Sequence, residues 1–212
     1  MLGIIYFSSM NLTSQRKFEL LQQQSEPFRA LLYDVDGTLA DNMHAHKAAY
    51  VATAAEYGIA LDDKIVDELA GWPTTAVAEE IAKRYLCEIN AQVFARRKSA
   101  IFIADFIEHT VPVDFVREHL LANIGRKRIG LVSGGSRKTL EQTLNVIGLT
   151  GKFETLVCAG DTPNGKPSPE PFLLAARRLE VPPEACLVFE DGDPGVQGAI
   201  AAGMGWIRVD QL

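Results

Sequence analysis

Residues 30–39 read Ala-Leu-Leu-Tyr-Asp-Val-Asp-Gly-Thr-Leu, an apolar run that leads directly into two carboxylates separated by one residue. A short apolar run bounded by turn residues is typical of a buried strand. Open α/β sheets bind their ligands at the carboxyl ends of such strands, so the stretch predicts that Asp34 and Asp36 reach a functional edge of a sheet. Alternatively, it is an acidic turn that Gly37 closes and in which Thr38 caps the next helix.

The composition limits the classes of protein to which the chain can belong. At 212 residues and 47% hydrophobic content, it is long enough for one domain with an insertion, or one domain with a small second one. The formal net charge of −6 disfavours binding to the phosphate backbone of nucleic acids. We therefore expect a small-molecule partner rather than nucleic acid, and a monomer or weak oligomer.

Targeting and redox features indicate a cytoplasmic protein. No stretch approaches the ~20 apolar residues of a membrane span, and the apolar residues 1–7 lack the basic region of a signal peptide. The three cysteines, Cys87, Cys158 and Cys186, are far apart and form no CxxC pair. Buried reduced thiols in a reducing compartment are the simplest interpretation.

The pattern of elements predicts an α/β fold. Residues 43–109 carry no convincing strand and are interpreted as helices over 44–57, 63–69, 75–86 and 91–109. Helices and strands then alternate, with strands predicted at 128–132, 155–159, 185–189 and 206–209. Helices are predicted at 114–123, 138–147 and 170–179, and a further one begins at residue 193. Such alternation is typical of a Rossmann-like parallel sheet covered by helices on both faces.

Two further predicted strands end in groups suited to a phosphate. Ser133 and Gly134 follow the strand 128–132, where glycine lets backbone N–H groups approach an anion at the start of the next helix. The alternative is an ordinary turn with a serine cap. Lys166 lies in a Gly/Pro-rich loop after the strand 155–159, where reduced backbone freedom suits a fixed cation. The alternative is a solvated loop lysine.

The strand 185–189 runs directly into Glu190 and Asp191. Carboxylates at the end of an apolar strand are costly to desolvate unless a cation or hydrogen-bond donors meet them. A hard divalent cation such as Mg²⁺ meets this need, and an acid-rich turn is the alternative. Because parallel strands place their carboxyl ends at one edge of the sheet, we expect all four polar ends to converge on a Mg²⁺-dependent phosphoryl-transfer site.

The residues at these strand ends resemble, in their order, the four motifs of the haloacid dehalogenase superfamily of phosphatases: Asp34-x-Asp36-Gly-Thr, Ser133, Lys166 and Glu190-Asp191. The likeness covers residues 28–212. The helical block after the first motif resembles the small α-helical cap of the β-phosphoglucomutase-like branch. Residues 189–197 are similar to the branch's sugar-phosphate phosphatases of the fructose-1-phosphate type. The resemblance implies a core at 28–42 and 110–212 and a cap at 43–109, and it leaves residues 1–27 outside as an N-terminal extension. The polar residues 13–24 of this extension are interpreted as a helix or a loose segment.

The resemblance also implies roles for these residues. Asp34 would be the nucleophile and form an aspartyl-phosphate, while Asp36 would protonate the leaving group and then deprotonate water. The carboxylates of Asp34 and Asp191 and the backbone carbonyl of Asp36 would bind Mg²⁺, with Glu190 as a further ligand or an outer-shell partner. Lys166 and Ser133 would neutralise the transferring phosphoryl group.

Three cap residues match substrate-contacting positions of this branch. His46 would face the two aspartates, Lys98 would contact substrate, and Trp72 would lie against a sugar ring. The alternatives are a surface histidine, a solvated basic turn and packing beneath the loop. The mutases of the branch carry an arginine just after the loop glycine, whereas this chain has Pro73-Thr74-Thr75, which favours a phosphatase that acts on a monophosphate over a mutase. A catalytically idle phosphometabolite-binding domain is the third hypothesis.

Overall fold

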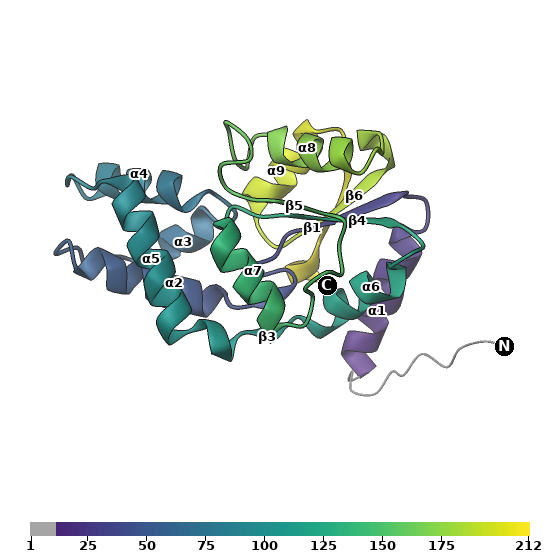
Figure 1. Cartoon of the computed structure of the whole chain (residues 1–212), viewed down its shortest axis with the longest axis horizontal. Coiled ribbons are helices and arrows are strands. Elements are labelled where there is room, and N and C mark those ends of the chain that lie inside the picture. The colour runs from purple at the N-terminus through teal and green to yellow at the C-terminus, as the bar shows by residue number, and fades with distance from the viewer. Residues whose placement is uncertain (1–11) are drawn as a thin grey trace.

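The protein is described here by a computed structural model that covers residues 12–212. Its centre is a five-stranded sheet in which every neighbouring pair is parallel (Figure 1). From one edge to the other, the sheet consists of β5 (Thr155–Val157), β4 (Arg128–Val132), β1 (Ala30–Tyr33), β6 (Cys186–Glu190) and β7 (Gly205–Arg208). Because β1 is central and buried along its whole length, it reads as a continuous apolar run rather than an alternating one.

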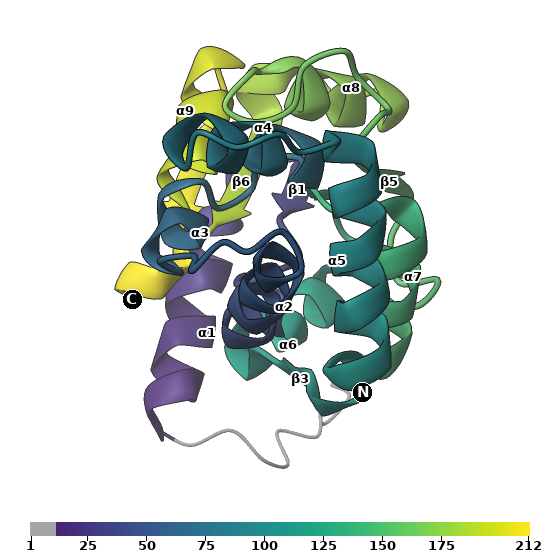
Figure 2. The same ribbon diagram turned by 90° about the vertical axis from the view of Figure 1, so that its left-hand side faces the viewer.

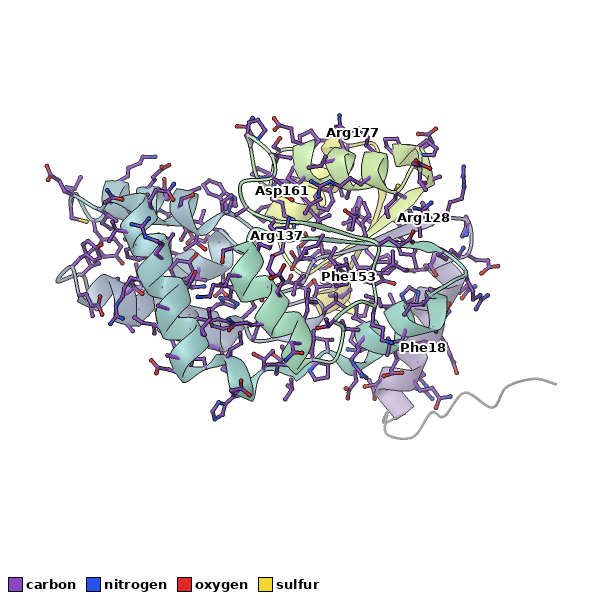
Figure 3. All side chains as sticks on the ribbon, in the orientation of Figure 1. Phe18, Arg128, Arg137, Phe153, Asp161 and Arg177 are labelled. Carbon is purple, nitrogen blue, oxygen red and sulfur yellow. The ribbon has the colours of Figure 1, made fainter. Side chains whose placement is uncertain are left out.

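Helices cover both faces of this sheet, which confirms the predicted α/β fold (Figure 1). One face packs against α8 (Glu170–Arg178) and α9 (Asp193–Ala201). The opposite face packs against α1 (Leu12–Ser25), α6 (Asp114–Asn123) and α7 (Arg137–Val146). Residues 13–24 thus lie in a helix, and its Phe18 and Leu21 are buried in the same cluster as α6 (Figure 3). The expectations for residues 1–11 fall outside the described residues.

A separate group of helices stands beyond the carboxyl end of the sheet. It consists of α2 (Met43–Ala55), α3 (Lys64–Glu68), α4 (Thr74–Arg84) and α5 (Ala91–Asp105), followed by a short 3₁₀ turn, η1 (Ile107–His109). This group has hydrophobic clusters of its own, around Tyr50 and Phe94 in one and Phe102 in the other. Figure 2 faces this cap and shows α2 to α5 in front of the ends of β1 and β6.

The chain passes between core and cap twice, and the two passages pair with each other. Ala40–Asp41 forms β2 and Val111–Pro112 forms β3, which make a two-stranded antiparallel ladder. Sequence patterns do not reveal this ladder because each strand has only two residues, too few for any periodicity. The pairing holds the two connections together, so the cap is joined to the core at one place.

Most differences between predicted and observed elements are short shifts at their ends. The predicted helix 91–109 divides into α5 and η1 near Phe106, whose backbone leaves helical geometry (φ −129°). The predicted strand 155–159 ends at Val157, after which Cys158 and Ala159 belong to the following loop. Among residues 12–212, no helix is long and apolar enough to cross a membrane.

Candidate active site

Lys166 and Asp34 form the centre of the site. The Lys166 ammonium donates to Oδ1 of Asp34 at 2.6 Å, to the carbonyl oxygen of Val132 at 2.8 Å, and to Oε1 of Glu190. All three partners lie at the ends of neighbouring strands β1, β4 and β6. The lysine predicted from its loop is therefore buried and fixed, and the solvated alternative is wrong.

Burial and charge act in opposite directions on this lysine. Burial lowers the pKa of Lys166, but the carboxylates of Asp34 and Glu190 raise it by more, so the net pKa is above its ordinary value. An ammonium with two carboxylate partners stays charged at any working pH. Lys166 is thus a permanent cation beside the Asp34 carboxylate.

Three carboxyl groups gather at the ends of β1 and β6. One ligand atom from each of Asp34, Glu190 and Asp191 lies within 4.8 Å of the others. Burial raises the pKa of Asp34 well above its ordinary value, although Lys166 lowers it, and burial together with Glu190 raises the pKa of Asp191 to about 7. Asp34 and Glu190 are buried and Asp191 is half-buried. One ammonium does not balance three carboxyl groups this close together, and oxygen donors in this number suit a hard divalent cation.

The backbone beside this cluster is adapted to a close approach. Gly37 has φ +89°, and a Cβ atom there would lie 2.1 Å from Oδ2 of Asp191. The hydroxyl of Thr38 donates to Oδ1 of Asp191 at 3.1 Å. Gly37 therefore serves two purposes, since it permits the turn and leaves room for the Asp191 carboxylate. The hydroxyl of Thr38 orients Asp191 instead of capping a helix.

Asp36 lies between core and cap. Its Oδ1 accepts a 2.7 Å hydrogen bond from Nδ2 of Asn42 and lies 3.1 Å from Nε2 of His46. Burial raises the pKa of Asp36, but His46 and Asn42 lower it by more, so that the net pKa is about 2. The two aspartates, only two positions apart in the sequence, therefore have opposite pKa shifts, which is the pattern of paired acids with different roles.

The cap contributes a buried pair of basic groups. Nζ of Lys98 lies 2.5 Å from Nδ1 of His46, whose ring stacks on Phe102 at a centroid distance of 4.0 Å. Burial lowers the pKa of Lys98 to about 8, and burial together with Lys98 lowers the pKa of His46. With Nδ1 facing the ammonium, the ring proton is on Nε2, toward Asp36. The structure therefore does not place either residue on a solvated surface.

A small chamber of about 60 Å³ connects these groups. Asp34, Asp36, His46, Lys98 and Ser133 all line it. The backbone N–H of Gly135 donates to the Ser133 hydroxyl at 3.1 Å, which orients that hydroxyl beside the chamber. The structure thus brings the predicted residues Asp34, Asp36 and Ser133 of the core and His46 and Lys98 of the cap to one space.

The cap loop lies directly on the loop that follows β4. A Cβ atom at Gly134 would lie 2.4 Å from the carbonyl oxygen of Gly71 and 2.6 Å from that of Trp72. Gly134 therefore permits the cap to approach the core. Trp72 lines the chamber and also packs against the hydrophobic cluster of the cap, so the position is compatible with both predicted roles.

Sequence reasoning missed Asn42. It immediately precedes α2, so its signal is that of a helix cap, yet its side chain makes no capping hydrogen bond and reaches Asp36 instead. Tyr50 was missed for a similar reason, because an aromatic residue on a helix face resembles packing. Its ring lies 4.5 Å from Nζ of Lys98 and helps to line the chamber.

Comparisons with known proteins agree with this geometry. A sequence profile of the haloacid dehalogenase-like hydrolases matches residues 28–203. The fructose-1-phosphate phosphatase YqaB of Escherichia coli is 32% identical over 190 residues, which cover 88% of this chain and 99% of that protein. A phosphorylated carbohydrates phosphatase of Thermotoga maritima is 34% identical over 184 residues, covering 82% of each chain.

A solved structure extends the likeness to three dimensions. The β-phosphoglucomutase of Clostridium difficile superposes with a TM-score of 0.74 at 27% identity, over 84% of this chain and 83% of that one. This protein therefore is an enzyme of the haloacid dehalogenase-like hydrolase family, in the branch that contains these phosphatases.

Proposed function

We propose that this enzyme is a Mg²⁺-dependent phosphatase that hydrolyses a small phosphorylated metabolite, a sugar phosphate, through an aspartyl-phosphate on Asp34. The observation that supports this most is the placement of Asp34, which lines the chamber while Lys166 holds one of its oxygens. The matches to phosphatases of fructose-1-phosphate and of phosphorylated carbohydrates support the sugar-phosphate class.

The reaction has two displacements at phosphorus. An oxygen of Asp34 attacks phosphorus while the bond from phosphorus to the sugar oxygen breaks, and a proton from Asp36 goes to the leaving alkoxide. Water then attacks the phosphorus of the aspartyl-phosphate while the bond from phosphorus to the Asp34 oxygen breaks. Asp36 takes a proton of that water, inorganic phosphate is released and the Asp34 carboxylate is restored. The Lys166 ammonium and the Ser133 hydroxyl stabilise the charge on the transferring group because they are already in position.

Asp36 must carry a proton for the first displacement and lose it for the second. In the structure, His46 and Asn42 favour its ionised form, which suits the acceptance of a proton from water. A bound phosphate brings negative charge next to Asp36, and like charge raises the pKa of a carboxyl group. Substrate itself therefore favours the protonated form that the first displacement needs.

The carboxyl cluster fits Mg²⁺. Asp34 and Asp191 would be its carboxylate ligands, with the backbone carbonyl of Asp36, and the ion would supply positive charge opposite the phosphoryl oxygens. Glu190 already binds Lys166, and a Cβ atom at Gly195 would lie 2.0 Å from its carboxyl carbon. This close packing supports a role for Glu190 in holding Lys166, outside the shell of direct ligands.

Phosphate release from a panel of sugar phosphates tests the proposal. The wild-type protein with Mg²⁺ is expected to release phosphate, whereas Asp34→Asn should show no turnover because an amide is a poor nucleophile. Turnover that persists in Asp34→Asn would exclude the proposed mechanism, and the absence of wild-type turnover would favour a binding domain. Glucose-1-phosphate as substrate distinguishes a phosphatase from a mutase, since a phosphatase would release phosphate and a mutase would yield glucose-6-phosphate.

A further inference from the structure

The chamber is too small for a whole sugar phosphate. Its volume of about 60 Å³ is far below the range of about 300–1,000 Å³ that ligand sites usually measure. A second space, of about 640 Å³, adjoins it. Thr74, Ser133 and Gly134 line both spaces, so the outer cleft begins where the chamber ends.

The outer cleft differs in charge from the rest of the protein. None of the described residues that line it is an aspartate or a glutamate, although the formal net charge of the chain is −6. Hydroxyl groups gather there instead, from Thr75, Ser99, Ser136 and Thr162 among others. Such a lining suits a polyhydroxylated molecule.

Besides Lys166, which pairs with Asp34 and Glu190, two exposed cations line this cleft. Arg96 comes from α5 of the cap and Lys138 from α7 of the core, two helices that lie side by side in Figures 1 and 2. Both residues are exposed. The cleft is therefore lined by positive charge from both domains.

The sequence neighbours of these two residues are neutralised, whereas they themselves are not. Arg97 binds Glu56 at 2.6 Å. Arg137 binds Asp161 at 2.9 Å, and Figure 3 labels both of these residues. Within residues 12–212, neither Arg96 nor Lys138 has a carboxylate partner. Adjacent positions on one helix point in different directions. Arg97 and Arg137 can therefore form ion pairs while their neighbours Arg96 and Lys138 line the cleft.

We infer that the outer cleft binds the far end of the substrate, and that Arg96 and Lys138 select a metabolite that carries a second anionic group there. The substrate class is then a hydroxyl-rich phosphate ester with a carboxylate or a second phosphate at its far end. This inference rests on the proposed function and refines its expectation of a monophosphate. Because one cation comes from each domain, the far anion also joins the cap to the core.

Binding to Asp34→Asn tests the inference independently of turnover. Isothermal titration calorimetry compares two pairs of compounds that differ at the far end: 6-phosphogluconate with glucose-6-phosphate, and fructose-1,6-bisphosphate with fructose-1-phosphate. In at least one pair, we expect the compound with two anions to bind about tenfold more tightly. The pair in which this difference is found identifies the far anion: a carboxylate for 6-phosphogluconate, a phosphate for fructose-1,6-bisphosphate. The preference should decrease with added salt, because both cations are exposed.

The selectivity variant is Arg96→Gln/Lys138→Gln in the same background. It should remove the preference while the affinity for glucose-6-phosphate and fructose-1-phosphate stays the same. Its matched control is Arg126→Gln/Lys152→Gln, which makes the same change in net charge at two exposed residues on a different surface and should keep the preference.

Equal affinity within both pairs, or an equal loss for both members in the selectivity variant, would overturn the inference. Neither result would affect the proposed phosphatase activity, whose own test is phosphate release by the wild-type enzyme.

Discussion

Nζ of Lys166 lies 2.6 Å from Oδ1 of Asp34, although 132 positions separate the two residues in the sequence. The contact forms because β1 lies between β4 and β6 in a parallel sheet, so that the ends of the three strands meet at one edge. The ammonium orients the carboxylate and also compensates for its burial. Structural and catalytic effects of this lysine can therefore be separated by substitution.

Replacement of the ammonium should affect stability and turnover to different extents. Lys166→Met leaves Asp34 and Glu190 without a cation partner, so we expect the free energy of unfolding to fall by roughly 3 kcal/mol and kcat to fall at least about 100-fold. Urea denaturation and phosphate release measure the two effects. Lys166→Met/Glu190→Gln should recover stability but not turnover, and Lys152→Met, on the surface, should change neither. Wild-type behaviour of Lys166→Met would contradict the described role.

Asn42 should act through Asp36. Removal of its amide in Asn42→Ala takes away a donor to the ionised carboxyl group, so the pKa of Asp36 should rise from about 2. We expect kcat to fall about tenfold because the carboxyl group is no longer held in place. The chemical shift of the Asp36 carboxyl carbon, followed with pH, measures the pKa.

Asn90→Ala is a matched control for Asn42→Ala. Asn90 caps α5 through a 3.1 Å hydrogen bond from Val93, so its loss should cost about 1 kcal/mol of stability without any change at Asp36. An unchanged pKa of Asp36 in Asn42→Ala would show that the amide has no influence on the acid.

Mg²⁺ should reverse the effect of Asp191→Asn on thermal stability. Without the ion, the variant removes a half-buried carboxyl group whose pKa desolvation and Glu190 raise to about 7, so at pH 8 it should melt above the wild type. A domain of this size gains roughly 2–4 °C for each kcal/mol. With saturating Mg²⁺, only the wild type should gain stability, by mass action, and the order should reverse.

Differential scanning fluorimetry with and without Mg²⁺ measures this reversal. Asp193→Asn is the control, because Asp193 lies two positions away with an exposed side chain that pairs with Arg208. The same response to Mg²⁺ in wild type and Asp191→Asn would exclude Asp191 as a ligand.

His119 should make the protein less stable in mild acid. Its Nδ1 lies 2.9 Å from the Tyr33 hydroxyl and its Nε2 lies 3.1 Å from the Ser25 hydroxyl, and burial lowers its pKa to about 4. An unfolded histidine has a pKa near 6.5, so between pH 6.5 and 4 the unfolded state binds the extra proton. The free energy of unfolding should therefore decrease over this interval as pH falls, by an amount on the order of 3 kcal/mol.

Urea denaturation at pH 7 and pH 5 measures the contribution of His119. His119→Gln should lose less stability than the wild type between these two values, whereas His109→Gln, at an exposed position, should behave as the wild type does. Identical losses in wild type and His119→Gln would mean that His119 does not contribute to the acid sensitivity.

Sequence reasoning reached the fold because its signals are local. The run that ends at Tyr33 and the turns after Val132 and Phe189 predict strands with polar ends, and parallel topology then places these ends at one edge. The β2–β3 ladder gave no comparable signal because its strands are too short. The packing of α1 against α6 depends on Phe18 and Leu21, whose spacing alone does not identify a partner.

The chain by itself determined the α/β architecture and the types of residue that meet in the chamber, since hydrophobic periodicity and motif order are written along the sequence. Only the tertiary structure decided what surrounds each group. His46 and Asn42 lower the pKa of Asp36 against the effect of burial, whereas burial raises the pKa of Asp34. Burial also distinguishes Lys166 and Lys98 from solvated lysines. These properties arise from atoms brought close together from distant positions, because solvation and Coulomb interactions depend on distance in space.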